Sequence, residues 1–264
     1  MKNIRISLAG ALTSIVILGP TSVGKTEIAF GLARKIGAEV INADKFYLFA
    51  DLPEVTGQSD ARRYPDVKAH LFGALQPDDT RWSESRYRRE VSGCLRGLQG
   101  LGRSAIVEGC SNGYVRAAID VLGSDEFAAR FPPLLIGLRP KCRVNLTADC
   151  ERRAAKMMSS GMAQAYGGYC RHEFGGSYVA RKCFARAPLR AYLSGRIGAT
   201  ACRNRVAEQL EHHAARHHLQ LSRIPGVIWI GHDRSNPEAT IRTILALRLA
   251  STLYGPPSPH RNQR

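Results

Sequence analysis

A phosphate-binding loop signature near the start of the chain leaves few folds open to it. Residues 19–26 read Gly-Pro-Thr-Ser-Val-Gly-Lys-Thr and fit the pattern G-x-x-x-x-G-K-[ST] throughout. The motif follows the β-branched run 14–18 and precedes an amphipathic stretch that begins at Lys25. It therefore lies between a predicted strand and a predicted helix, which is the context that its mechanism requires.

Each part of this loop has a distinct chemical use. The backbone amides of residues 21–26 would point at phosphate oxygens at the N-terminus of the following helix. Lys25 adds a positive charge, and the Thr26 hydroxyl is placed to hold a magnesium ion. The loop predicts that a phosphate chain is held, and it leaves open whether a phosphoryl group is transferred or the phosphate leaves. The other candidate phosphate-binding positions are Gly19, Ser22, Val23 and Gly24.

Strand-like and helix-like segments alternate along the rest of the chain. The pattern predicts strands at 14–18, 39–42, 104–108, 134–138 and 227–230, and helices at 25–35, 83–98 and 237–253, the last of them capped by Asn236. Such alternation indicates a parallel sheet with helices on both faces. The expected class is α/β, with a P-loop NTPase-like sheet.

A strongly basic segment lies in the second half of the chain. The formal net charge is +16, and between Arg139 and Arg223 sixteen Lys and Arg face five Asp and Glu. Residues 144–218 have a helical pattern throughout. We expect a single P-loop domain over 1–264, with 144–218 as a basic helical lobe within it. A basic field favours polyanions such as RNA, nucleotides or diphosphates, although a generally basic solvated surface explains the same count.

Cysteine usage and hydropathy indicate a compartment. The chain has seven cysteines without a C-x-x-C pair, which is typical of reduced thiols in the cytoplasm. Lys2, Arg5 and the following apolar run imitate a signal peptide, but that run leads directly into the phosphate loop. No apolar run approaches the roughly 20 residues that span a bilayer. We therefore expect a cytoplasmic protein with no membrane partner.

Asp44 ends the second predicted strand, in the segment INADKFY. Strand ends of a parallel sheet face the ligand crevice, so Asp44 would point at whatever lies beside the phosphate. The same residue would also suit a cap for the segment that starts at Lys45. The residue pattern leaves both roles open.

Several motifs in order resemble the isopentenyltransferases, the dimethylallyl transferases that prenylate N6 of adenine. The segment 19–44, GPTSVGKTEIAFGLARKIGAEVINAD, is similar to the opening of that family, and Thr56-Gly57 falls where the family has a Ser/Thr-Gly element. Further matching segments are HLFGALQPDDTRWSESRYRRE (70–90), IVEGCSNGYVRA (106–117), ERRAAKMMSSGM (151–162) and RIPGVIWI (223–230). Their order and spacing are more specific than the loop alone.

The resemblance implies that the loop holds the diphosphate of a prenyl donor, and that this diphosphate is the leaving group. Lys25 and the loop amides would bind the diphosphate, with Mg²⁺ at Thr26. Thr21 would form a hydrogen bond near the scissile oxygen, and Arg153 would be a second cation beside the diphosphate. Asp44 would accept the N6 proton. Thr56 would help to orient the amine, and Ser111 is a further substrate-binding candidate, although it would also suit a cap for a helix that begins at Asn112.

Two branches of the family differ in their acceptor. The tRNA-modifying enzymes carry a long helical insertion after the G-G-[ST] turn, whereas only about twenty residues separate Tyr114 from Leu134 here. The short form resembles the adenylate isopentenyltransferases of cytokinin biosynthesis. The implied partners are dimethylallyl diphosphate, or its hydroxylated analogue, and AMP, ADP or ATP, with tRNA less favoured. The large basic charge argues modestly for tRNA.

Three features depart from the family or fit it loosely. Cys110 replaces a glycine of the G-G-[ST] turn, and residues 175–178 match only loosely the region that contacts the adenine nucleotide. His213 and His217 would lie on one helical face, which suits a metal site less well than a solvated polar face.

Two other functions fit parts of the sequence. A P-loop kinase for a small hydroxyl substrate would use Asp44 as base and Arg153 as a lid arginine. A basic RNA-binding protein with a nucleotide switch would need neither role.

Overall fold

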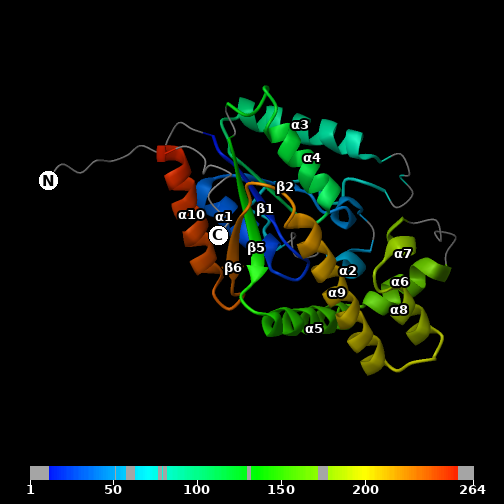
Figure 1. Ribbon diagram of the computed structural model, residues 1–264. Helices are drawn as coiled ribbons and strands as arrows, with labels where there is room; N and C mark the ends of the chain where they lie inside the picture. Colours follow the sequence, from blue (N-terminus) through cyan, green and yellow to red (C-terminus); the bar gives the residue numbers. More distant parts are fainter. Residues whose placement is uncertain are drawn as a thin grey trace.

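Six parallel strands form one sheet at the centre of the molecule (Figure 1). The computed structural model describes residues 12–50, 52–57, 63–76, 79, 82–129, 132–171 and 178–254. The strand order is β3-β2-β4-β1-β5-β6, so the strand that carries the phosphate loop lies inside the sheet. The strands are β1 (Ser14–Leu18), β2 (Glu39–Asn42), β3 (Ala69–His70), β4 (Ala105–Gly109), β5 (Pro133–Pro140) and β6 (Ile228–His232).

The helices begin and end close to the predicted positions. Ser83 caps α3 by accepting a bond from the Arg86 amide at 3.2 Å, and Asn236 accepts the Ala239 amide at 3.2 Å at the start of α10. The elements are α1 (Lys25–Ile36), the 3₁₀ turn η1 (Phe46–Leu48), α2 (Pro53–Thr56), α3 (Glu84–Gly100), α4 (Asn112–Leu122), α5 (Arg143–Ser159), α6 (Met162–Arg171), α7 (Tyr178–Lys182), α8 (Arg186–Leu193), α9 (Ala199–Leu221) and α10 (Pro237–Tyr254).

Alternate side chains of β1 enter two separate hydrophobic cores. Ile15 and Ile17 pack with α1 and α10, while Val16 and Leu18 pack with α3 and α4. All four side chains are fully buried, as expected for a strand covered on both faces. Figure 1 shows α1 and α10 on one side of the sheet and α3 and α4 on the other. The predicted α/β class with a P-loop-like parallel sheet is confirmed.

Helices α5 to α9 occupy the chain between β5 and β6 (Figure 1). Helix α5 lies along α9, and the short helices α6, α7 and α8 gather beside them. Residues 1–11 and 172–177 lie outside the described residues, so the signal-like start and residues 175–177 of the loosely matching region are not placed. Among the described residues, no helix combines the length and apolarity needed to cross a bilayer.

Candidate active site

The phosphate loop connects β1 to α1 at the carboxyl edge of the sheet. Gly19 must lack a side chain, because a Cβ atom there would overlap the carbonyl oxygen of Leu138 on β5. Gly24 has φ 93°, and Ser22 has φ 67°, a left-handed conformation that costs a non-glycine residue energy. Outliers of this kind concentrate at ligand-binding loops. The loop is therefore held in a shape that its own residues would not prefer.

Lys25 folds back over this loop. Its side chain is buried, and Nζ donates a hydrogen bond to the Pro20 carbonyl oxygen at 2.8 Å. This places a buried ammonium at the N-terminus of α1, where the helix dipole also favours an anion.

Glu108, in β4, faces the loop from the neighbouring strand. Thr26 Oγ1 donates to Glu108 Oε1 at 3.2 Å. Burial raises the pKa of the Glu108 carboxyl to about 7; the Lys25 ammonium opposes that shift, and the charge of Asp44 adds to it. A hydroxyl and one carboxylate suit Mg²⁺, which is usually bound through one or two carboxylates together with substrate phosphates and water. The residues present therefore fit the predicted ion, with Glu108 added to Thr26.

Asp44 lies just beyond β2 and lines both the larger and the smaller of the two cavities described below. Its Oδ1 accepts the backbone amide of Phe46, the first residue of η1, at 3.0 Å. Its Oδ2 accepts a bond from the Cys110 thiol at 2.8 Å. Burial and the adjacent Asp44 charge raise the pKa of this thiol well above its usual range. The residue that replaces the family glycine thus contacts the predicted base directly.

Arg153 joins three parts of the site from α5. Nη1 donates to Thr21 Oγ1 at 2.8 Å, and Nη2 donates to the Thr56 carbonyl oxygen at 3.3 Å and to the Tyr47 hydroxyl at 3.5 Å. Gly57 makes room for it, since a Cβ there would lie 2.6 Å from Nη2. The predicted residues Thr21, Thr56 and Arg153 therefore form one cluster.

Ser111 lies at the N-cap of α4, but its hydroxyl does not cap that helix. Ser111 Oγ instead accepts the Lys45 amide at 2.8 Å, which ties the start of α4 to the segment after Asp44. Thr56 Oγ1 donates to the Pro53 carbonyl oxygen at 3.4 Å. Both side chains line the smaller of two cavities described next.

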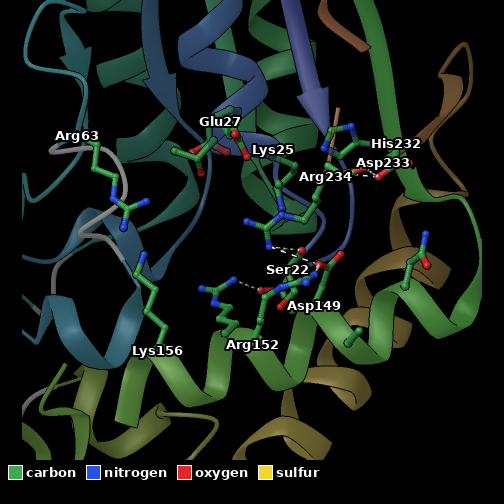
Figure 2. A pocket seen from close by; sticks show the side chains of 18 of the residues that line it. Ser22, Lys25, Glu27, Arg63, Asp149, Arg152, Lys156, His232, Asp233 and Arg234 are labelled. Carbon is green, nitrogen blue, oxygen red and sulfur yellow. Dashed lines mark hydrogen bonds and ion pairs between the residues drawn. The ribbon is translucent and has the colours of Figure 1, made fainter. Parts of the chain in front are cut away.

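The larger cavity, of about 810 Å³, opens over the phosphate loop (Figure 2). Its lining includes six basic side chains, Lys25, Arg63, Arg152, Arg153, Lys156 and Arg234, and five acidic ones, Glu27, Asp44, Glu108, Asp149 and Asp233. Figure 2 shows Lys25 and Arg234 near the loop and Arg152 and Lys156 projecting from α5. The basic side chains outnumber the acidic ones by only one, so the phosphate loop and the buried Lys25, and not the net charge of the lining, make this a site for a phosphate chain.

The smaller cavity, of about 90 Å³, adjoins the first and is mostly apolar. Four residues line both: Thr21, Asp44, Tyr47 and Arg153. The apolar side chains around it are Phe46, Val55, Val179, Phe184 and Leu210. A carboxylate and a guanidinium thus stand where a phosphate-binding cavity meets a short hydrocarbon-lined one.

The interpretation of His213 and His217 as a solvated polar face is wrong. Both line the small cavity, and burial lowers the pKa of His217 to about 4 despite the opposing charge of Asp44. They continue the inward face of α9 that Val206 and Leu210 begin, at helical spacing from those buried residues. The part of the chain that the structure describes contains no group of three His, Cys, Asp or Glu side chains suited to a metal.

The predicted phosphate-binding residues divide into two groups. Ser22, Gly24 and Thr26 line the large cavity. Gly19 and Val23 line neither of the two cavities, and Val23 is buried in the core with α1. Sequence analysis did not predict Glu108. Its position at the end of a buried strand, in IVEGC, is the signal that could have identified it. Sequence analysis also did not predict Tyr47, Arg234 and His232, for which no local pattern exists.

The loop, the sheet order and the paired cavities define a P-loop protein of the α/β class. Residues 13–67 match the family model described as isopentenyl transferase. This match, together with the relatives below, confirms the resemblance to the isopentenyltransferase family.

Relatives fall in both branches of that family. A tRNA dimethylallyltransferase of Phenylobacterium zucineum is 34% identical over 149 residues, covering 56% of this chain and 45% of the relative. Adenylate isopentenyltransferase 8, chloroplastic, of Arabidopsis thaliana is 28% identical over 179 residues, covering 62% and 53%. The chain thus spans about half the length of these curated relatives or less.

A solved structure has the same fold. The tRNA delta(2)-isopentenylpyrophosphate transferase of Staphylococcus epidermidis superposes with a TM-score of 0.75 over 89% of this chain and 98% of that one, at 16% identity.

Proposed function

We propose that this chain is a prenyltransferase that moves a dimethylallyl group from dimethylallyl diphosphate to N6 of AMP, ADP or ATP. The observation that carries the proposal is the junction of the two cavities, where Asp44 and Arg153 line both. The larger cavity, with the phosphate loop and Lys25, suits the diphosphate, and the adjoining apolar cavity suits a short branched hydrocarbon. The bond between them would lie beside Arg153.

The reaction follows from charge development at that junction. The N6 lone pair attacks the allylic carbon, and the carbon–oxygen bond breaks with its electron pair remaining on the diphosphate. Lys25, the loop amides and Arg153 stabilise the departing charge, since donors aimed at developing charge supply much of the catalysis in such sites. Asp44 takes the N6 proton. Thr21 holds Arg153 in place, and Thr56 and Ser111 shape the acceptor side.

Thr26 and Glu108 would hold Mg²⁺. When bound, the ion would offset negative charge on the diphosphate. Glu108 is suited to this because its buried carboxylate already meets the Thr26 hydroxyl.

Free nucleotide is the proposed acceptor because of the short connection after α4. That helix ends at Leu122 and β5 begins at Pro133, so little chain is available there to hold an anticodon stem. Reading an RNA loop requires surface that grips the stem while one base is splayed out. The cysteine usage supports the cytoplasm as the compartment.

Transfer to tRNA is the second candidate. The tRNA dimethylallyltransferases among the relatives favour it, as does the excess of cations between Arg139 and Arg223. It shares the donor and the prenyl chemistry and differs in the acceptor alone.

One incubation separates the candidates. The protein is mixed with dimethylallyl diphosphate, MgCl₂ and, in parallel, AMP, ADP, ATP or unmodified tRNA, and products are read by mass spectrometry. N6-dimethylallyl nucleotide with little modified tRNA is the expected result. Modified tRNA with inert nucleotides would move the assignment to the second candidate. Phosphorylated product from ATP without prenyl transfer would make the protein a kinase.

A further inference from the structure

His232 ends β6 beside the phosphate loop and is not used by the mechanism above. The side chain is 2% exposed and lines the large cavity. Its Nδ1 is 2.8 Å from Thr240 Oγ1 in α10, which fixes the ring. Its Nε2 is buried and has no hydrogen-bond partner among the described residues. A buried polar atom left without a partner costs about 1–3 kcal/mol, so such an atom requires a reason.

The unpartnered nitrogen is directed at the loop. A Cβ atom on Gly24 would lie 3.1 Å from His232 Nε2 and 3.4 Å from Arg234 Nε. Arg234 Nη1 in turn donates to the Ser22 carbonyl oxygen at 3.3 Å. Figure 2 shows His232 and Arg234 together on the side of the loop nearest β6. An imidazole and a guanidinium therefore border the loop on the side nearest β6.

We propose that His232 binds the phosphate chain from the side of the loop nearest β6. Its Nε2 donates a hydrogen bond to a diphosphate oxygen, and the ring takes up a proton as the diphosphate binds. This rests on the proposed function, since it assumes that the loop holds a diphosphate. It goes further by assigning a binding role to a residue outside the phosphate-loop motif and a proton to the binding step.

The surrounding charges agree with a proton that arrives with the ligand. Burial lowers the pKa of His232 from its ordinary value, and Arg234 and Lys141 act in the same direction, while Asp149 and Asp233 oppose them. In the free protein at neutral pH the ring is therefore largely uncharged. An entering diphosphate adds at least two negative charges beside Nε2 and favours the imidazolium. Affinity for diphosphate should then rise as the pH falls from 8 toward 6.

Calorimetric titration with inorganic diphosphate tests this, in buffers of different ionisation enthalpy at pH 7.5 with MgCl₂ present. Diphosphate itself titrates, so the informative quantity is the proton uptake of the wild type minus that of each variant. His232→Asn keeps an amide near Nδ1 for Thr240 and removes the Nε2 position. His232→Gln places a neutral donor near Nε2. His212→Gln, at an exposed position of α9, is the control.

The expected result is a loss of diphosphate affinity of about 10- to 100-fold in His232→Asn, on the scale of a hydrogen bond between charged groups, with the proton uptake abolished. His232→Gln should recover part of the affinity without the proton. NMR of the wild-type imidazole should show protonation on adding diphosphate. Equal affinity in wild type and both variants, or an imidazole that stays neutral, would overturn the inference and leave the prenyl transfer intact. Absence of any diphosphate binding to the wild type would instead remove the proposed function and this inference with it.

Discussion

Arg153 Nη1 donates to Thr21 Oγ1 at 2.8 Å, and this bond joins α5 to the phosphate loop across 132 positions of the chain. The guanidinium also contacts the Thr56 carbonyl oxygen and the Tyr47 hydroxyl. One side chain therefore links α5 to the phosphate loop at the place where the two cavities meet.

Arg153→Ala should lower the rate of prenyl transfer by about 100-fold or more, because a donor aimed at the leaving diphosphate is lost. Arg152→Ala is the matched control from the next position. Arg152 pairs with Asp149, and its side chain is 71% exposed, so its removal should change the rate only a few-fold. Single-turnover kinetics on both variants provide the measurement. Equal losses in the two variants would show that general basic charge, and not the Thr21 contact, is what matters.

Lys25→Ala should lower the transfer rate by about 100-fold or more for the same electrostatic reason. The variant also frees the Pro20 carbonyl oxygen, so a thermal unfolding curve must accompany the rate. Turnover at the wild-type level with an unchanged curve would exclude the loop from the active site.

Asp44→Asn keeps the shape of the side chain and removes the proton acceptor. Donor binding should survive while transfer from saturating donor falls by roughly 100-fold or more, as expected for loss of a positioned base. Donor affinity is measured by calorimetry and transfer by rapid quench. A collapse of donor affinity with unchanged transfer would make Asp44 a structural residue, in keeping with its bond to the Phe46 amide.

Glu108→Gln tests the magnesium assignment. Loss of this carboxylate should raise the Mg²⁺ concentration for half-maximal activity by about 10-fold or more, since Mg²⁺ sites with few protein ligands depend on each one. Thr26→Ala should act in the same direction. A Mg²⁺ titration at saturating donor measures the effect, and identical titration curves for wild type and both variants would rule this pair out as ligands.

His217 should make the fold less stable in acid. Its folded pKa of about 4 lies below the ordinary value of 6.5, so between these values the unfolded chain binds more protons, and stability falls as the pH drops from about 6.5 to about 4. Between pH 7 and pH 5 the loss is on the order of 2 kcal/mol. His217→Gln should reduce this pH dependence, whereas His212→Gln should keep it. Urea unfolding at pH 7 and pH 5 measures the free energy of unfolding. An equal loss of this free energy in wild type and His217→Gln would refute the assignment.

The elements that carry regular periodicity were predictable from sequence. The ends of α1, α3, β4, β5 and β6 differ from the predicted ones by two residues or fewer, because capping residues and hydrophobic spacing are local signals. The two-residue strand β3 was not predicted, since its pairing with β2 depends on a neighbour far away in sequence.

The residues of the active site also divide into those that local sequence predicts and those that it does not. The loop residues follow from a contiguous motif, whereas the contact of Arg153 with Thr21 was accessible only through resemblance to a family. Glu108 and His217 were misjudged or missed because their roles depend on burial. A carboxylate in a strand and a histidine on a helix have the same local pattern whether they face solvent or a cavity.

The short turn between α9 and β6 restricts the insertions and deletions that this protein can accept in evolution. His217 in α9 lines the small cavity, and His232, fifteen positions later at the end of β6, lines the large one. Nine of these positions lie in β6 or in the last turn of α9, which leaves only 222–227 as connecting chain. Inserting or deleting a residue there would shift α9 relative to the sheet. Such a shift would alter the small apolar cavity and the phosphate-binding cavity at the same time. Lineages with a longer or shorter prenyl donor should therefore vary the side chains that face the small cavity while the length of this turn stays constant.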